Sequence, residues 1–112
     1  MELLQAVKDT AKALDLKFGR DIVVLEISKI SVIADYFIIT TGGNPNQIQA
    51  LAEATEEALQ KYGIRARNVE GMREANWVLM DFGDIIVHIF DDENRQYYDL
   101  EHTWADAVVM AV

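Results

Sequence analysis

The segment at residues 77–90 constrains the fold of this chain more than any other. It contains two short runs rich in apolar residues, separated by Gly83 and Asp84. A glycine in this position suits a two-residue β-hairpin turn, because the first central residue of such a turn can have a positive φ. The sequence therefore predicts two antiparallel strands in which Phe82 pairs with Ile85.

This register divides the hairpin into two faces of different character. Because side chains alternate along a strand, residues two apart share a face. One face is wholly apolar and is expected to lie on the core: Val78, Met80, Phe82, Ile85, Val87 and Ile89. The other combines large apolar groups with a carboxylate and an imidazole: Trp77, Leu79, Asp81, Ile86, His88 and Phe90. Two alternatives remain open for this second face. Either a helix covers it, as in two-sided α/β sheets, or it is an interaction surface.

Periodicity predicts one helix and two strands in the first 41 residues. Apolar residues at spacings of three and four indicate an amphipathic helix that ends near Gly19. The β-branched run at residues 21–27 indicates a buried strand. A second apolar run at residues 36–41 indicates another strand, which two glycines stop.

The next helix has clear signals at both ends. Asn44 suits the N-cap, and Pro45 suits the first helical position, where a missing N–H costs nothing. Gly63 suits the left-handed position after the last turn. The chain is then expected to return as a strand at residues 64–69, parallel to the strand before the helix.

The C-terminal segment at residues 94–111 is expected to be helical. Four of its side chains are expected to dock it on the remainder of the protein: Arg95, Tyr98, Glu101 and Trp104. Together the elements predict an α/β fold, a mixed β-sheet of about five strands with flanking helices. The chain contains no internal repeat or linker, so we expect one domain over residues 1–112.

Composition narrows the functional classes. The chain has no cysteine, which excludes disulfides and thiolate metal sites. No stretch approaches the roughly 18 apolar residues of a membrane span, and residues 1–5 lack the basic start of a signal peptide, so we expect a cytoplasmic protein. The net charge of −9 opposes direct binding to nucleic acid and favours a basic partner. The alternative is that this charge only keeps the protein soluble.

Candidate catalytic and metal-binding motifs each have a simpler explanation. The turn at residues 42–46 precedes a helix but lacks the Lys-Ser/Thr of a phosphate-binding loop, so a helix cap is the better account. Asp35, Asp81 and Asp84 could bind Mg²⁺. However, Asp81 and Asp84 flank a hairpin turn and are expected to point in different directions. The two histidines, His88 and His102, have no ligand spacing. We therefore expect no metal site and no cofactor.

Several motifs, taken together, resemble the ribosomal silencing factor family, also called RsfS or Iojap. They occur in order along nearly the whole chain: Ala34-Asp35-Tyr36-Phe37, Glu70-Gly71, residues 77–90, and Arg95-Gln96-Tyr97-Tyr98-Asp99-Leu100-Glu101 with Trp104. The most specific of them is the hairpin pattern Trp-Val-Leu-x-Asp-x-Gly-Asp-x-x-Val-His-x-Phe.

The resemblance implies a function as well as a fold. It implies a topology related to nucleotidyltransferases without their catalytic carboxylates, and no enzymatic activity. It implies docking on ribosomal protein fourteen of the large subunit, which would block the small subunit and repress translation when nutrients are short. No membrane and no specific nucleic-acid contact are expected.

The resemblance also implies where the partner binds. The family's partner-binding surface, carried over to this sequence, falls on the Trp-containing hairpin, with an acidic residue at its rim: Trp77, Leu79, Asp81, Asp84 and His88. Some relatives form homodimers, which leaves a homodimer open here. Two other functions remain as alternatives, a nucleotidyltransferase-like enzyme and a homo-oligomerisation module.

Overall fold

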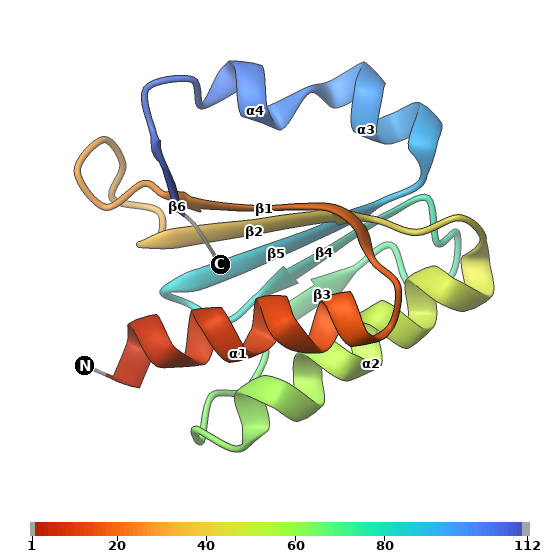
Figure 1. Cartoon of the computed structure of the whole chain (residues 1–112), viewed down its shortest axis with the longest axis horizontal. Coiled ribbons are helices and arrows are strands. Elements are labelled where there is room, and N and C mark those ends of the chain that lie inside the picture. The colour runs from red at the N-terminus through yellow and green to blue at the C-terminus, as the bar shows by residue number, and fades with distance from the viewer. Residues whose placement is uncertain (1, 111–112) are drawn as a thin grey trace.

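Helices lie on both faces of a six-stranded sheet in the computed structural model, which describes residues 2–110 (Figure 1). The helices are α1 (Glu2–Leu16), α2 (Pro45–Gln60), α3 (Asp92–Tyr98) and α4 (Leu100–Thr103). The strands are β1 (Arg20–Glu26), β2 (Tyr36–Thr41), β3 (Asn68–Glu70), β4 (Trp77–Asp81), β5 (Ile85–Phe90) and β6 (Val108–Met110). The predicted α/β fold with a mixed sheet is confirmed, with six described strands where about five were expected.

The sheet has the strand order β3-β4-β5-β2-β1-β6. The two central strands, β2 and β5, are paired in parallel, and the other described neighbours are antiparallel. A parallel pair needs a long crossover, and α2 with the β3–β4 ribbon supplies it. Both central strands are buried along their whole length.

The strand predicted at residues 64–69 begins later than expected. It covers Asn68–Glu70 at the edge of the sheet and pairs with β4. It runs in the same direction as β2, as predicted for the crossover, but β4 and β5 lie between them. The Arg67 N–H donates to the Asp81 carbonyl at 2.7 Å, so pairing begins only where the chain reaches the end of β4.

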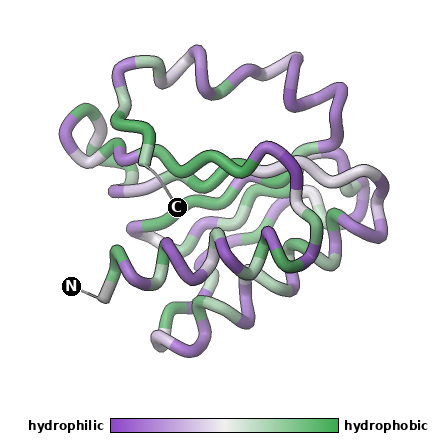
Figure 2. Tube along the Cα trace, viewed as in Figure 1, coloured by the Kyte–Doolittle hydropathy of each residue, from purple (hydrophilic) through white to green (hydrophobic). Residues whose placement is uncertain are grey.

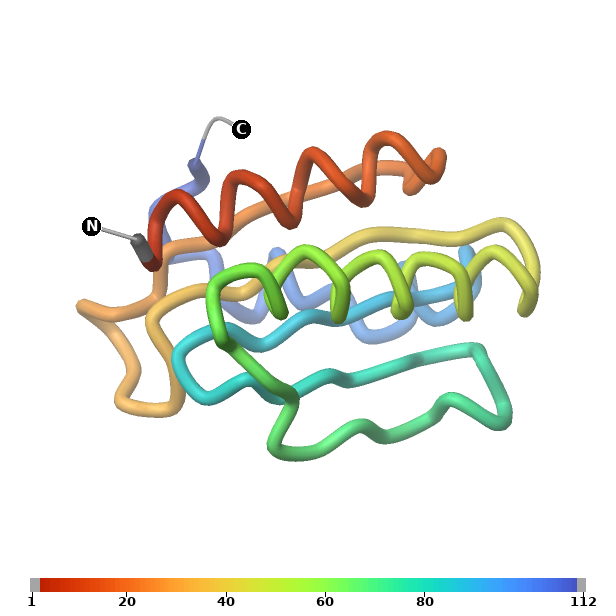
Figure 3. The backbone as a smooth tube through the Cα atoms, turned by 90° about the horizontal axis from the view of Figure 1, so that it is seen from below, coloured from red at the N-terminus to blue at the C-terminus, as the bar shows by residue number. Residues whose placement is uncertain are grey.

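The main core lies between the sheet and helices α1 and α2, which pack side by side on one face (Figures 1 and 3). The hydrophobic colouring of Figure 2 is concentrated along the strands in the middle of the view, above these helices. All six hairpin residues predicted for the core face are buried here: Val78, Met80, Phe82, Ile85, Val87 and Ile89. That prediction is confirmed.

The ends of the two long helices follow different rules. The Asn44 side chain accepts a hydrogen bond from the Gln47 N–H at 2.8 Å, and Gly63 has φ +72, as predicted for the ends of α2. Helix α1 ends at Leu16, and Phe18 rather than Gly19 takes the left-handed conformation, with φ 64. Gly19 is needed for another reason, because a Cβ there would lie 2.8 Å from Thr40 Oγ1.

The prediction that residues 94–111 are helical is confirmed for the parts within α3 and α4 and is wrong for residues 104–110. Asp99 has φ 41 and separates α3 from α4. After α4 the chain turns back, and β6 pairs antiparallel with β1. Val108 and Val109 are β-branched and favour this extended conformation. Residue 111 lies outside the described residues.

Arg95 ties α3 to the first two strands. Its guanidinium donates to Thr41 Oγ1 at 2.8 Å and to the Asp21 carbonyl at 2.7 Å. It also forms an ion pair with Glu101 at 2.9 Å, and its side chain is only 10% exposed. Hydrogen bonds from an ionised guanidinium are stronger than those between neutral groups. The predicted role of Arg95 and Glu101 in docking the C-terminal segment is confirmed.

The substitution Gly71→Ala should destabilise the fold more than Gly63→Ala does. Both glycines have a positive φ, but a Cβ on Gly71 would lie 2.0 Å from the Trp77 carbonyl oxygen, whereas one on Gly63 meets nothing within 4 Å. We expect a loss of about 1 kcal/mol for Gly63→Ala from left-handed strain alone, and about 3 kcal/mol for Gly71→Ala. Urea unfolding measures both, and equal losses would contradict the close approach.

Candidate protein-binding surface

The β4–β5 hairpin has the turn that its sequence predicts. The Phe82 N–H donates to the Ile85 carbonyl at 2.9 Å, and Gly83 has φ +90. The Asp81 carboxylate accepts a hydrogen bond from the Gly83 N–H at 2.8 Å, which fixes the turn from within. The strand register follows, with Met80 opposite Val87. The hairpin therefore presents a rigid second face on the side of the sheet away from α1 and α2.

Aromatic rings are stacked at one end of this second face. The Trp77 indole stacks on Phe90 with ring centroids 5.1 Å apart and lies 4.3 Å from the Tyr98 ring of α3. Large aromatic pairs in such arrangements contribute beyond the area that they bury. The predicted docking role of Tyr98 is confirmed, since its ring attaches α3 to the hairpin.

The C-terminal segment covers the middle of the same face. Trp104 packs edge-on against Phe37 of β2 at 5.1 Å, and Leu100 joins the same apolar cluster. This contact confirms the predicted docking role of Trp104. The arrangement also answers the alternative that the sequence left open. Ile86 is 8% exposed and Phe90 0%, so the covered-face alternative holds for both.

His88 is also covered, with only 5% of its surface exposed. The Trp77 Nε1–H donates to His88 Nδ1 at 3.2 Å, so the imidazole is neutral and carries its hydrogen on Nε2. That Nε2 is buried and has no hydrogen-bond partner among the described residues. Burial lowers the pKa of His88 to about 4. His88 therefore holds the indole in one orientation and does not itself form part of the outer surface.

The remaining candidate residues lie where the C-terminal segment no longer fully covers the second face. Trp77, Leu79 and Asp81 alternate along β4 and are half-buried, while Asp84 in the turn is exposed. Among the described strands, the three-residue β3 alone lies beyond β4, and all its residues are exposed. The structure thus brings four of the five predicted residues to one partly open edge: Trp77, Leu79, Asp81 and Asp84.

The acidic residues near this edge do not form a metal site. Within residues 2–110, no group of three His, Asp or Glu side chains is placed to hold a metal ion. Asp81 is engaged with its own turn, and Asp35 contacts Asp84 through the backbone, with its N–H 2.9 Å from the Asp84 carbonyl. The side chains of Asp35, Asp81 and Asp84 are therefore not gathered into such a group.

The turn before α2 also uses its polar groups internally. The Gly43 N–H donates to Gln47 Oε1 at 2.5 Å, and the Gln47 N–H donates to Asn44. The Gln47 amide in turn donates to the Phe18 carbonyl at 2.9 Å. The predicted helix cap is confirmed, and these N–H groups are not available to a phosphate.

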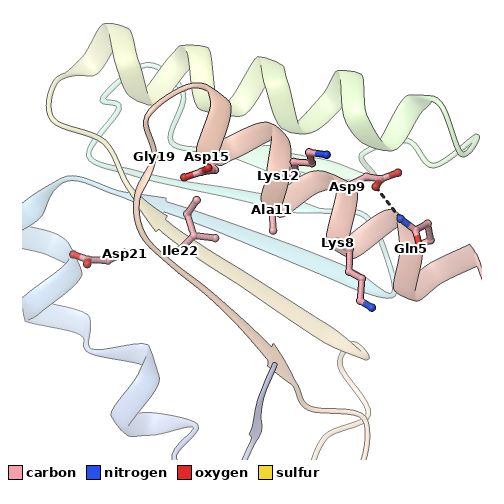
Figure 4. A pocket seen from close by; sticks show the side chains of 9 residues that line it. All are labelled: Gln5, Lys8, Asp9, Ala11, Lys12, Asp15, Gly19, Asp21 and Ile22. Atoms are coloured by element: carbon pink, nitrogen blue, oxygen red, sulfur yellow. Dashed lines mark hydrogen bonds between the residues drawn. The ribbon is translucent and has the colours of Figure 1, made fainter. Parts of the chain in front are cut away.

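A groove beside α1 was not predicted from the sequence. It has a volume of about 710 Å³ and lies between α1 and the start of β1 (Figure 4). Its lining mixes both signs of charge around a small apolar floor: Gln5, Lys8, Asp9, Ala11, Lys12, Asp15, Gly19, Asp21 and Ile22. The mixture gives no field of one sign, and no three carboxylates of the described lining are placed to hold a metal ion. No single motif could have revealed it, because its two walls meet only in the fold.

No helix within residues 2–110 is both long enough and apolar enough to cross a bilayer. The fold is a mixed α/β fold, and Trp77, Leu79, Asp81 and Asp84 lie along a partly open edge of its sheet.

Comparisons with known proteins identify the family. Residues 1–112 match the family model described as "Ribosomal silencing factor during starvation". The Ribosomal silencing factor RsfS of Bacillus subtilis is 43% identical over 90% of this chain and 86% of that protein. The chloroplastic protein Iojap of Arabidopsis thaliana is 34% identical over 92% of this chain and 42% of that protein. This chain belongs to the ribosomal silencing factor family.

Solved structures agree with this assignment. A protein of Chromobacterium violaceum superposes with a TM-score of 0.88 at 34% identity, over 94% of this chain and 88% of that one. A protein of Bacillus halodurans superposes with a TM-score of 0.81 at 36% identity, over 99% and 98% of the two chains. The resemblance that the hairpin motif suggested is therefore confirmed for both family and fold.

The free energy of unfolding should decrease as the pH is lowered from 6.5 towards 4, because of His88. Its pKa of about 4 in the fold lies below its ordinary value of 6.5, so the unfolded chain binds the proton more readily. The stabilisation is complete above pH 6.5 and is lost as the pH falls towards 4, by on the order of 3 kcal/mol. Urea unfolding across this range measures the slope.

Two variants isolate this effect. His88→Gln should flatten the slope between pH 6.5 and 4, whereas His102→Gln, at an exposed position, should retain it. Hydrogen bonds from Tyr62 and Arg20 lower the pKa values of Asp9 and Asp92 below 3.8. Those carboxylates therefore change the stability only at a pH below the range of this test. An unchanged slope in His88→Gln would show that the imidazole is not buried in its neutral form.

Proposed function

We propose that this protein binds ribosomal protein fourteen of the large ribosomal subunit and sterically prevents the small subunit from joining. It would thereby repress translation under nutrient limitation, in the cytoplasm, without catalysing a reaction. The observation that carries the proposal is the partly open Trp77 edge in a chain of this family. The family and its Bacillus subtilis relative are both known as ribosomal silencing factors, which supports a ribosomal partner.

The distribution of charge supports a basic partner. Residues 81–112 contain eight Asp or Glu and one Arg, whereas residues 1–80 contain eleven acidic and nine basic residues. Most of the net charge of −9 therefore lies in the turn, β5 and the C-terminal segment. This is the side of the sheet that carries α3 and α4, and its trace is mainly hydrophilic in Figure 2. Ribosomal proteins are typically basic, so complementary charge would speed their encounter with this side.

The proposed contact has an apolar centre and an acidic rim. Trp77 and Leu79 would supply the buried contact area, with Asp81 beside them and Asp84 at the rim. His88 acts through Trp77, because it is covered and accepts the indole N–H. A tryptophan held in one orientation loses little conformational entropy on binding, which favours affinity. This arrangement is typical of an interface with a few strong anchors.

The dimensions of the protein support a steric mechanism. Its principal extents are 33 × 31 × 24 Å, many times the distance across which two surfaces can make contact. A body of this size on the subunit-facing side of the large subunit would keep the small subunit out of reach. No chemical step is required, and release of the protein would restore joining.

A subunit-joining assay tests the proposal directly. Purified bacterial large subunits are incubated with the protein, small subunits are added, and joining is followed by light scattering and gradient sedimentation. We expect joining to decrease with a dependence that matches binding to the large subunit. Failure to bind large subunits would overturn the proposal and favour a homo-oligomerisation module, which sedimentation of the protein alone would reveal.

The substitution Trp77→Ala should weaken binding to the large subunit by about thirtyfold, roughly 2 kcal/mol. The matched control is Trp104→Ala, which removes an indole from the same cluster beside α4. Both variants should melt at lower temperature, but only Trp77→Ala should lose binding when both are measured well below their melting points. Equal losses of binding would show that Trp77 works only as part of the covered core.

The substitution Asp84→Asn should change the rate of association more than the rate of dissociation. An exposed rim charge steers encounter and contributes little to the docked contact. We expect a twofold to threefold slower association at low salt and no difference at high salt, which stopped-flow or surface-based kinetics can measure. Asp15→Asn on α1 removes the same charge from the other side of the sheet and should leave the rate unchanged.

A further inference from the structure

The connection between β1 and β2 exposes an unusual amount of apolar surface. Val32 is 104% exposed, Ile33 61% and Ile30 45%. All three are β-branched residues of a kind that folding normally buries. Figure 2 shows a hydrophobic stretch within this connection, at the outer end of the molecule.

The connection is held in shape by hydrogen bonds that do not involve these side chains. The Ile27 N–H donates to the Asp35 carbonyl at 2.9 Å, which closes the base of the loop. The Ser31 N–H donates to the Ile27 carbonyl at 2.9 Å, and the Ser31 hydroxyl accepts from the Ile33 N–H at 3.0 Å. The exposed apolar groups are therefore not needed to form the loop, yet the loop presents them in a fixed arrangement.

The same loop is joined to the hairpin turn. The N–H groups of Asp35 and Tyr36 both donate to the Asp84 carbonyl, at 2.9 and 3.0 Å. Figures 1 and 3 show the β1–β2 connection beside the β4–β5 turn at one end of the sheet. The apolar loop and the proposed docking edge are thus continuous through Asp84.

The charge around the loop matches that of the proposed docking edge. Asp35 lies at the base of the loop and Asp84 lies next to it, while Lys29 is the one basic residue of the connection. Apolar groups beside carboxylates fit a basic protein that offers an apolar patch between lysines or arginines. A phosphate backbone would not fit, because it is repelled by the carboxylates and offers no apolar patch.

We propose that Val32 and Ile33 form a second anchor for the same basic protein partner, separate from the Trp77 edge and joined to it by the Asp84 turn. This inference rests on the proposed function and extends its contact surface to the β1–β2 connection. Two anchors at a fixed separation would orient the protein on its partner as well as bind it. Orientation matters for a steric mechanism, because the position of the body decides what it blocks.

The test uses the double variant Val32→Ser, Ile33→Ser against the control Leu16→Ser, Phe18→Ser. The control residues are 69% and 81% exposed and precede β1, so they lie at the opposite end of that strand. Neither variant removes a buried group, and both should melt like the wild type. Binding to purified large subunits should weaken about tenfold in the loop variant and remain unchanged in the control.

The outcomes separate this inference from the proposed function. If the wild type binds, Trp77→Ala weakens binding and the loop variant behaves like the control, the second anchor is overturned and the proposed function stands. If the wild type does not bind large subunits, the proposed function itself fails. If the loop variant instead abolishes self-association in sedimentation, the partner that binds Val32 and Ile33 is a second copy of this chain, and the inference is overturned.

Discussion

The parallel pairing of β2 with β5 is the interaction on which the rest of the structure depends. Each of these strands is buried along all six of its residues, so the centre of the sheet must be covered on both faces. Helices α1 and α2 cover one face. The chain after β5 covers the other face, where Leu100, Trp104 and Ala107 pack on the second apolar cluster.

The cover on the second face is strong at one side and incomplete at the other. Arg95 joins α3 to the end of β2 and to β1 by hydrogen bonds, and Trp104 packs on Phe37 of β2. The C-terminal segment therefore covers the centre of this face. The cover thins towards β4, where Trp77 and Leu79 remain half-buried. A protein that needed only stability would gain by closing this edge. The proposed function uses this partly open edge, where the Trp77 indole N–H is held by His88.

The candidate surface could be predicted from the sequence in part. The alternation of residues 77–90 around Gly83 separated the core face from the second face correctly, because period two is a local property of a strand. Motif resemblance pointed to Trp77 and Leu79 without any structure. The burial of His88 could not be predicted, because it involves contact with Phe37 of β2, which is distant in the sequence.

By itself, the sequence determined the hairpin and its turn, both ends of α2, the apolar face of the core and the family. These follow from local rules, such as strand alternation, the conformational freedom of Gly63 and Gly83, and the capping chemistry of Asn44. Only the tertiary structure decided that β5 pairs with β2, that the C-terminal segment breaks at Asp99 to add β6, and that the loop with Val32 lies beside Asp84. Those features depend on contacts between segments far apart in the chain, and the energy of such contacts leaves no periodic signal in the sequence.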